Sequence, residues 1–172
     1  MVDYNTEKDI QIYELLDGKI VMMASSKVPH NFISGNIYNI FSKYLKGKKC
    51  VPFGDSTDVI FEIKKDIVIP DFFIVCNRNI IRYNGIYGTP DLIVEVLSPS
   101  TFKYDVNYKF NLYEKAGVRE YWIVDPRAKT VCAFIMQPDG NFDNGTFYEC
   151  NQKAPVFIFE GLEIDLNELF EE

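Results

Sequence analysis

An apolar run with a single acid inside it constrains this chain most. Residues 92–97 have the sequence LIVEVL, in which Glu95 is surrounded by aliphatic side chains. Such a run, without alternating polar residues, is typical of a strand buried on both faces. A carboxylate in a buried strand costs several kcal/mol unless it is paired, protonated or bound to a cation. A divalent metal ion near Glu95 would meet that requirement.

The segment of about 26–125 has the pattern of a helix, three strands, a helix and a fourth strand. Apolar residues recur at three- and four-residue spacing in the two helices, and short runs rich in Ile, Val and Phe mark the strands. The helices are expected at 29–46 and 102–116, and the strands at 59–63, 67–75, 92–97 and 120–124. This order indicates an α/β or α+β fold, a mixed β-sheet flanked by helices.

Both ends of the chain add elements to this core. Asp17–Gly18 lies between the strand-like segments 12–16 and 19–23 and favours a β-hairpin turn. Towards the C-terminus, 130–136 and 147–149 predict an antiparallel β-ribbon, and 167–170 a short helix. No repeat or linker interrupts the 172 residues, so we expect one domain over 1–172.

Composition limits the classes of function. The chain has 18 Lys and Arg against 25 Asp and Glu, a net charge of -7, so binding a polyanion would need a local basic patch. No apolar run approaches the ~18 residues of a membrane span, and the acidic, polar N-terminus does not resemble a signal peptide. We therefore expect a cytoplasmic protein without a membrane partner.

The cysteines and the histidine exclude some chemistry. The four cysteines are widely spaced and form no C-x-x-C pair, and His30 is the only histidine. An ordinary zinc site would need four clustered Cys or His ligands. The cysteines are expected to be reduced thiols, with Cys76 buried at a strand end. Carboxylates and lysines are then the groups left for catalysis.

Two Pro-Asp dipeptides begin strands near Glu95, and Asp71 and Asp91 are their acids. Asp91 and Glu95 share a strand and would lie roughly 13 Å apart, too far to share an ion. Asp71 precedes the neighbouring strand, and adjacent strands are only about 4.8 Å apart. A suitable register would therefore bring Asp71 and Glu95 together as oxygen ligands for Mg²⁺ or Mn²⁺.

Lys109 lies in the apolar stripe of the second predicted helix. If that helix packs over the end of strand 92–97, the ammonium would approach Glu95 and could orient an attacking water or stabilise a developing negative charge. Tyr113, one turn later, could donate a hydrogen bond to a phosphate.

Each candidate also has a purely structural interpretation. Asp71 and Asp91 could cap turns after their prolines, and Lys109 could pair with Asp105 on the helix surface. Glu14 in the first hairpin could reach the metal ion as an accessory acid or be a solvated strand residue. His30 could be a general base or, more commonly, a surface histidine in the first turn of a helix.

Several stretches of this chain resemble the Uma-two family of restriction-endonuclease-like proteins, within the PD-(D/E)XK nuclease superfamily. The resemblance covers nearly the whole chain. It rests on the stretches YELLDGKIVMM, VIPDFFIV, TPDLIVEVLSPSTFKYDVNYKFNLYEKAGVREYWIVDP and GLEIDLNELF, and on the histidine at the start of the first helix.

The resemblance implies a restriction-endonuclease-like core with a metal-dependent phosphodiesterase site. Asp71 would be the first motif's aspartate, Glu95 the acid of the second, and the Val96 carbonyl a further ligand. The superfamily lysine normally lies two residues after that acid, where this chain has Leu97. In this family the lysine is thought to have moved to the following helix, which Lys109 fits. The Lys109-x-x-x-Tyr113 spacing resembles the Q-x-x-x-Y element of related nucleases.

The function that follows is a Mg²⁺- or Mn²⁺-dependent endonuclease that hydrolyses DNA, with Asp71 and Glu95 holding the ion and Lys109 assisting the water. Alternatives are a catalytically inactive nuclease-like binding or scaffold module and a hydrolase of a small phosphodiester. Restriction-type enzymes often pair to cut both strands, so we expect a homodimer, with the aromatic segment 156–159 as a candidate contact.

Overall fold

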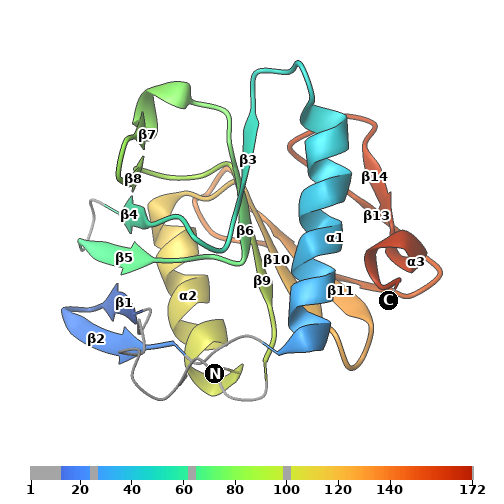
Figure 1. Cartoon of the computed structure of the whole chain (residues 1–172), viewed down its shortest axis with the longest axis horizontal. Helices are drawn as coiled ribbons and strands as arrows, with labels where there is room; N and C mark the ends of the chain where they lie inside the picture. The colour runs from blue at the N-terminus through green and yellow to red at the C-terminus, as the bar shows by residue number, and fades with distance from the viewer. Residues whose placement is uncertain (1–12, 24–26, 62–64, 99–101, 172) are drawn as a thin grey trace, which may run out of the picture.

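Two six-stranded sheets and three α-helices form the part of the chain that the computed structural model describes, residues 13–23, 27–61, 65–98 and 102–171. The central sheet has α1 on one face, and α2 and the second sheet on the other (Figure 1). The helices are α1 (Val28–Leu45), α2 (Phe102–Ala116) and α3 (Leu166–Leu169), with a short 3-10 helix at Arg78–Ile80. The fold is a mixed α+β fold.

The central sheet has the strand order β12-β11-β10-β9-β6-β3. β9 and β10 are parallel and the other neighbours antiparallel, so the sheet is mixed. Its strands are β3 (Val51–Gly54), β6 (Phe72–Val75), β9 (Leu92–Val96), β10 (Glu120–Asp125), β11 (Thr130–Ile135) and β12 (Thr146–Glu149).

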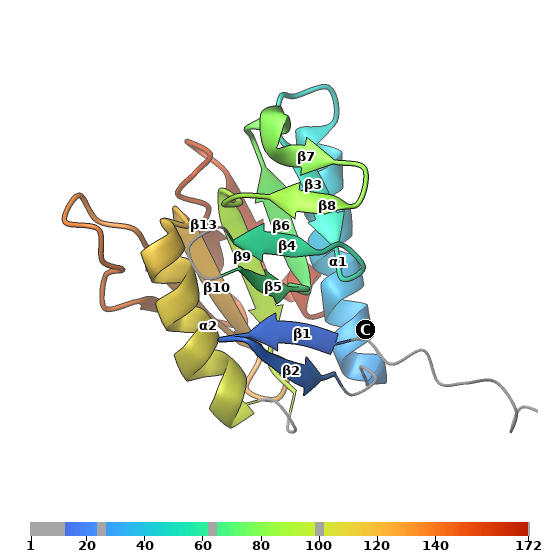
Figure 2. The same cartoon turned by 90° about the vertical axis from the view of Figure 1, so that its left-hand side faces the viewer.

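The second sheet has the order β2-β1-β5-β4-β8-β7 and stands in front of the central sheet in Figure 2. Its strands are β1 (Tyr13–Leu16), β2 (Lys19–Met22), β4 (Val59–Phe61), β5 (Asp66–Val68), β7 (Ile81–Arg82) and β8 (Gly85–Tyr87). A separate ribbon pairs β13 (Lys153–Pro155) with β14 (Glu163–Asp165).

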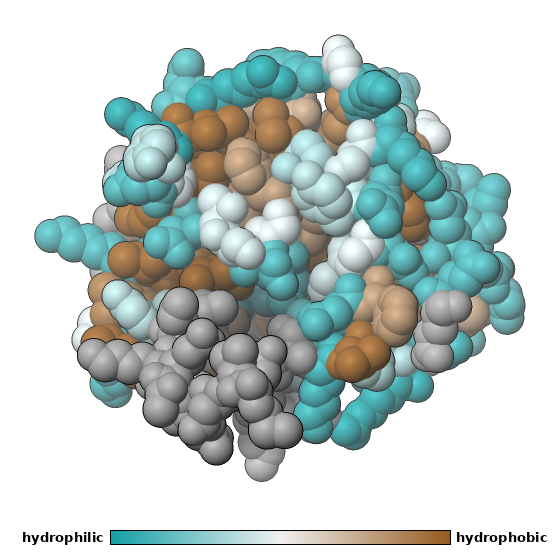
Figure 3. All heavy atoms as spheres, in the orientation of Figure 1, coloured by the Kyte–Doolittle hydropathy of each residue, from teal (hydrophilic) through white to brown (hydrophobic). Residues whose placement is uncertain are grey.

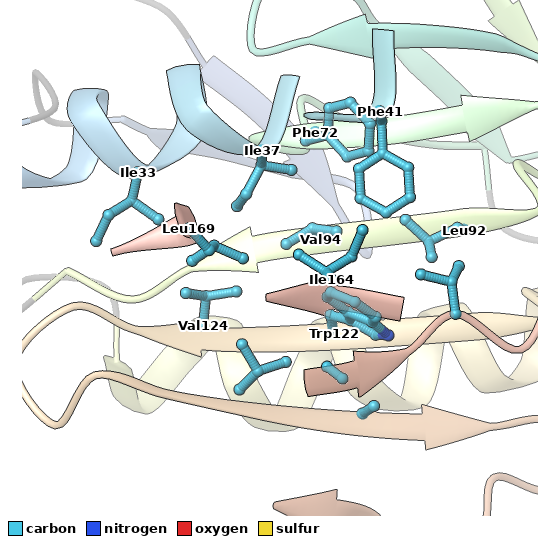
Figure 4. Packing of buried hydrophobic residues seen from close by; sticks show 14 of the residues in the cluster. Ile33, Ile37, Phe41, Phe72, Leu92, Val94, Trp122, Val124, Ile164 and Leu169 are labelled. Carbon is cyan, nitrogen blue, oxygen red and sulfur yellow. The ribbon is translucent and has the colours of Figure 1, made fainter. Parts of the chain in front are cut away.

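Alternation along β9 divides its side chains between two cores. Leu92, Val94 and Val96 pack with α1, as Figure 4 shows for the first two, while Ile93 packs in the core on the side of α2. Glu95 alternates with the α1-facing residues and contacts α2 through its side chain. The period of two in a strand therefore turns the one acid of this run towards α2.

Most predicted elements are confirmed. Asp17 and Gly18 have φ of 51° and 74°, as the predicted hairpin turn between β1 and β2 requires. The predicted helix 102–116 coincides with α2, and α1 differs from 29–46 by one residue at each end. The predicted ribbon of 130–136 and 147–149 forms as β11 and β12, but these two strands extend the central sheet.

The region between the two long helices differs from the expected three strands. The described residues there form seven strands, because β3, β7 and β8 were not foreseen and the expected strand 67–75 is two strands. β5 belongs to the second sheet and β6 to the central sheet, with Pro70 between them. Proline has no N–H for a sheet ladder, which explains the break. The expected strand 59–63 ends at Phe61, and residues 62–63 lie outside the described part.

The expectation of four free thiols is wrong. Cys50 and Cys76 form a disulfide between residues 4.0 Å apart at Cα, whereas Cys132 and Cys150 are free. Val51 pairs with Val75, so the antiparallel register of β3 and β6 places the two cysteines opposite each other. Spacing along the sequence could not reveal this pair, because the strand β3 was not predicted.

The segment 156–159 is a turn after β13, with Val156 buried. Ile158 and Phe159 also pack against the core, which leaves Phe157 as the exposed aromatic side chain. This segment therefore offers less surface for a second copy than its sequence suggested. None of the described helices is long and apolar enough to cross a membrane.

Candidate active site

The antiparallel pairing of β6 and β9 sets the position of the two acids. Phe72 is paired with Val94, so one residue further along each strand Asp71 lies opposite Glu95. Pro70 ends the preceding strand segment, and Asp71 enters the central sheet at this point. Neighbouring strands lie about 4.8 Å apart, so the two carboxylates begin on adjacent backbones.

Asp71 connects β9 to α1. Its Oδ2 accepts a hydrogen bond of 2.7 Å from the Val96 N–H, and its Oδ1 lies 3.1 Å from His30 Nε2. His30 is in the first turn of α1 and only 7% exposed. Both carboxylate oxygens of Asp71 are therefore fixed by neighbours, and the Val96 backbone lies directly beside them.

Glu95 is held by two side chains of α2. Its Oε1 accepts hydrogen bonds from the Tyr113 hydroxyl at 2.5 Å and from Lys109 Nζ at 3.1 Å. Lys109 and Tyr113 are four residues apart, so they lie on the same face of the helix. Glu95 Oε2 has no hydrogen-bond partner among the described residues, although Glu95 as a whole is 7% exposed.

Glu14 brings a third carboxylate from the second sheet. Its Oε1 lies 2.9 Å from Lys109 Nζ and also accepts a hydrogen bond of 2.9 Å from the Ile69 N–H. Glu14 and Lys109 are each 2% exposed. The lysine is thus buried between two carboxylates, one from each sheet, and these contacts offset the cost of burying its charge.

Burial and charge shift the titration of these groups. The pKa of Glu95 is raised to about 8, chiefly by burial; Lys109 lowers it, and the charges of Asp71 and Glu14 also raise it. Burial lowers the pKa of His30, but the hydrogen bond and charge of Asp71 outweigh burial and raise it overall. Burial also raises the pKa of Tyr113 well above its usual value. Burial therefore disfavours the ionised form of Glu95, and Lys109 opposes that effect.

The residues present fit a hard divalent cation. Among the described residues no three His, Cys, Asp or Glu side chains form a ready-made metal cluster. Mg²⁺, however, needs only one or two carboxylates and keeps several waters. Asp71, Glu95 with its unpartnered Oε2, and the adjacent Val96 backbone offer oxygen donors of this kind. A cation beside Glu95 would also favour the ionised form that burial opposes.

The structure separates the remaining candidates. Lys109 is buried rather than on the helix surface; its predicted pairing with Asp105 stays a prediction, because the Asp105 side chain lies outside the described part. His30 and Glu14 are likewise buried rather than solvated. Asp91 lies away from this cluster: its Oδ2 accepts a hydrogen bond of 2.7 Å from the Cys76 N–H.

Two buried acids were not singled out from the sequence. Asp66 accepts hydrogen bonds from the Asp17 N–H and the Tyr108 hydroxyl, which ties the first hairpin and α2 to β5. Glu120 accepts a hydrogen bond of 2.7 Å from Trp122 Nε1. Both acids are fully buried and hydrogen-bonded within the fold. The only indication of this burial in the sequence was the position of Glu120 in a predicted strand.

Comparison with known proteins gives the family. The profile of the Uma2 family, described as "Putative restriction endonuclease", matches residues 2–167. The chain belongs to the Uma2 family. The predicted resemblance to this family is therefore confirmed.

Two individual proteins extend the comparison. An uncharacterized protein of Synechocystis is 26% identical over 137 residues, which span 79% of this chain and 72% of that protein. A crystal structure from Anabaena variabilis, described as "a putative nuclease belonging to DUF820", superposes with a TM-score of 0.79 at 20% identity. The match covers 96% of this chain and 93% of that chain, so the two share one fold. The Uma2 chain thus has the fold of a protein described as "a putative nuclease".

Proposed function

We propose that this Uma2 protein is a Mg²⁺- or Mn²⁺-dependent endonuclease that hydrolyses DNA phosphodiester bonds. The observation that carries this proposal is the buried cluster of Glu95, Lys109 and Glu14 beside Asp71. A lysine paired with two buried acids costs stability that a purely structural core would not need to lose. The family description and the fold shared with a protein described as a nuclease support the same reaction class.

Asp71 and Glu95 would hold the cation, with the Val96 carbonyl as a further donor. When bound, a divalent cation polarises a phosphoryl oxygen and lowers the pKa of its water. His30 Nε2 and the Val96 N–H keep the Asp71 carboxylate in place. The Tyr113 hydroxyl is occupied by Glu95 in this structure, so Tyr113 acts as a positioning residue for that acid.

Lys109 would act on the attacking water and on the negative charge that develops on the phosphate. Glu14 and Glu95 hold its ammonium inside the cluster, 2.9 Å from Glu14 Oε1 and 3.1 Å from Glu95 Oε1. A fixed positive charge in a buried site stabilises developing charge more strongly than it would in water. Glu14 would act through Lys109, by keeping the ammonium beside Glu95.

The proposal is tested by incubating labelled single- and double-stranded DNA with the protein at low salt, with Mn²⁺, with Mg²⁺ and with EDTA. We expect metal-dependent cleavage by the wild type and none by Glu95→Ala or Asp71→Ala. Asp91→Asn is the matched control, because Asp91 is the acid of the second Pro-Asp dipeptide. It forms hydrogen bonds with the Cys76 N–H and with Arg119, away from the cluster. Cleavage by all variants would indicate a contaminating nuclease and overturn the assignment.

A second candidate function is hydrolysis of a small phosphodiester, which the net charge of -7 disfavours less than a long polyanion. Salt separates the two substrates. Binding of DNA weakens steeply as salt rises, whereas binding of a small diester depends on it only slightly. Metal-dependent hydrolysis of a chromogenic diester without any DNA cleavage would favour this candidate.

We also propose that the protein acts as a homodimer, joined through β2 rather than through 156–159. Among the described strands, β2 is at the edge of the second sheet, so no other described strand pairs with its outer backbone groups. Ile20 and Met22 on this strand are 66% and 50% exposed. An open edge with exposed apolar side chains favours pairing with another strand. A cytoplasmic location, expected from the sequence, remains a prediction.

A further inference from the structure

The charges of this acidic protein are distributed unevenly along the chain. Residues 18–54 contain six lysines and no Asp or Glu. The rest of the chain then has 18 - 6 = 12 basic and 25 acidic residues, a net charge of -13 against +6 for this segment. The segment includes β2, α1 and β3, and four of its six lysines lie in the last turn of α1 or directly after it.

The lysines gather at the end of α1. Lys43, Lys46, Lys48 and Lys49 are exposed, and none of them forms an ion pair with an acid in the part of the chain described here. Lys48 Nζ lies 3.1 Å from the centre of the Tyr44 ring, which holds the ammonium at the surface. In Figure 3, hydrophilic atoms line the upper rim of the molecule, where α1 ends in Figure 1.

The helix places this lysine cluster (Lys46, Lys48 and Lys49) at a fixed distance from the candidate active site. His30, which contacts Asp71, is in the first turn of α1, and Lys46 is its C-cap. Sixteen residues at 1.5 Å per residue separate the two by about 24 Å. One strand of DNA has a phosphate every 3.4 Å along the axis, so this distance corresponds to about seven nucleotides.

Between these two points the exposed side chains of α1 include no acid, and apart from Phe32 near its start several of them are polar. Asn31, Tyr38 and Asn39 are exposed there, and such side chains commonly contact phosphates and sugars. One flank is covered, because Asn36 Nδ2 donates hydrogen bonds to the carbonyls of Leu169 and Glu171. Asn36 lies ten residues before Lys46, about 15 Å along the helix. This distance exceeds the Debye length at physiological salt, so an acid beside Asn36 is largely screened from Lys46.

We infer that the lysine cluster binds the phosphate backbone of the nucleic-acid substrate about seven nucleotides from the bond that is cut. The inference rests on the proposed nuclease function and adds the path of the substrate along α1. It also answers the objection from overall charge, because residues 18–54 contain no acid and the exposed lysines at the end of α1 form no ion pair with a described acid. The lysines fix position along the backbone and select no sequence.

The test is equilibrium binding of a fluorescent duplex of about 20 base pairs in EDTA, across a series of salt concentrations. The variant Lys46→Gln/Lys48→Gln/Lys49→Gln removes three exposed charges but keeps the main-chain carbonyl of Lys49 that accepts from Arg78 Nε. We expect the slope of log K against log salt to become shallower by up to about 2.7, since each phosphate contact contributes about 0.9. Between 50 and 200 mM salt, the wild type would then lose about 40-fold more affinity than the variant.

The matched control is Lys65→Gln/Arg82→Gln/Lys115→Gln, which changes the net charge equally at exposed sites on the second sheet and α2. It should keep the wild-type slope. Equal slopes for the wild type and the Lys46, Lys48 and Lys49 variant, or equal losses in both triple variants, would overturn the inference. An unchanged slope would instead point to an acidic protein as the partner of this face.

Cleavage with Mn²⁺ is measured separately, so the two proposals fail independently. If the lysine variant loses salt-dependent binding while no DNA is ever cut, the binding face stands and the nuclease assignment fails. If wild type and variant cut and bind DNA alike, the nuclease stands and the binding face fails.

Discussion

At the scale of single residues, the protonation of Glu95 couples the candidate site to stability. Its pKa is raised from 4.5 to about 8 by burial, so between these pH values the folded protein holds a proton that the unfolded chain has released. Stability therefore falls as pH rises through this window, because the folded state binds more protons. Burial of this acid makes the fold less stable at alkaline pH, which is consistent with a residue kept for function.

We predict that Glu95→Gln reduces this loss of stability. In EDTA, the melting temperature of the wild type should fall more between pH 5 and pH 9 than that of the variant, because a glutamine side chain does not ionise. Mn²⁺ should then raise the melting temperature of the wild type and leave the variant almost unchanged. Thermal denaturation at several pH values checks both points; parallel curves for the two proteins would contradict them.

Glu14→Gln tests whether Glu14 positions Lys109. Glutamine keeps an oxygen that can accept from the Ile69 N–H but removes the charge 2.9 Å from Lys109 Nζ. We expect turnover of DNA to fall roughly 10- to 100-fold, the usual cost of losing a residue that orients a group of the metal site, at nearly unchanged Mn²⁺ affinity. The melting temperature should fall as well, because Lys109 loses one of the two acids that offset the burial of its charge. Wild-type turnover by the folded variant would make Glu14 a structural residue only.

At the scale of elements, the break at Pro70 is what assembles the site. A continuous strand over 67–75 would have kept Ile69 and Asp71 in one sheet. Instead β5 pairs with β1, so that Ile69 meets Glu14, and β6 pairs with β9, so that Asp71 meets Glu95. One residue without an N–H thus lets a single segment connect two sheets at the point where their acids converge.

The Cys50–Cys76 disulfide joins β3 and β6 and closes a loop of 26 residues. On the chain-entropy account, a loop of this length contributes about 3 to 4 kcal/mol to stability. We predict that dithiothreitol lowers the melting temperature of the wild type but not that of Cys50→Ser/Cys76→Ser. An unchanged wild-type melting temperature would show that the bond does not stabilise the fold. Alkylation of thiols in cell extract would report whether the bond exists in the cell.

At the scale of the whole molecule, the second sheet contributes both to the site and to the proposed dimer. Tyr13, Ile20 and Met22 on the β1–β2 hairpin are at least 50% exposed, and Val28 and Phe32 at the start of α1 are also exposed. These side chains leave apolar surface in contact with water, which a second copy of the chain would bury.

We predict that the protein is a dimer and that Ile20→Lys/Met22→Lys is a monomer, because the two charges oppose pairing of the β2 edges. Light scattering after gel filtration measures both masses. Phe157→Lys is the control, since Phe157 is equally exposed but lies in the turn after β13. A monomeric wild type, or a dimer disrupted by Phe157→Lys alone, would contradict the placement at β2.

Local sequence patterns predicted the long helices, the first hairpin and the two unusual residues, Glu95 and Lys109. Spacing of apolar residues fixed α1 and α2, and Asp17–Gly18 fixed the first hairpin, because these patterns depend on neighbours a few residues away. The acid in LIVEVL and the lysine in an apolar helix stripe were recognisable for the same reason: each breaks a local pattern. They led to the prediction that Lys109 approaches Glu95, whereas the family was predicted from the resemblance of long stretches of the chain.

The contacts of Glu14 and Glu95 with Lys109 depend on the tertiary fold. The pairing of β1 with β5 that brings Glu14 to Lys109, and the register that sets Cys50 opposite Cys76, join segments far apart in sequence. Strand register depends on which sheet a segment enters, and the break at Pro70 changed the sheet within one apparent strand. Local patterns do not specify such long-range pairing, so burial of His30 and Glu14 became evident only from the packed fold.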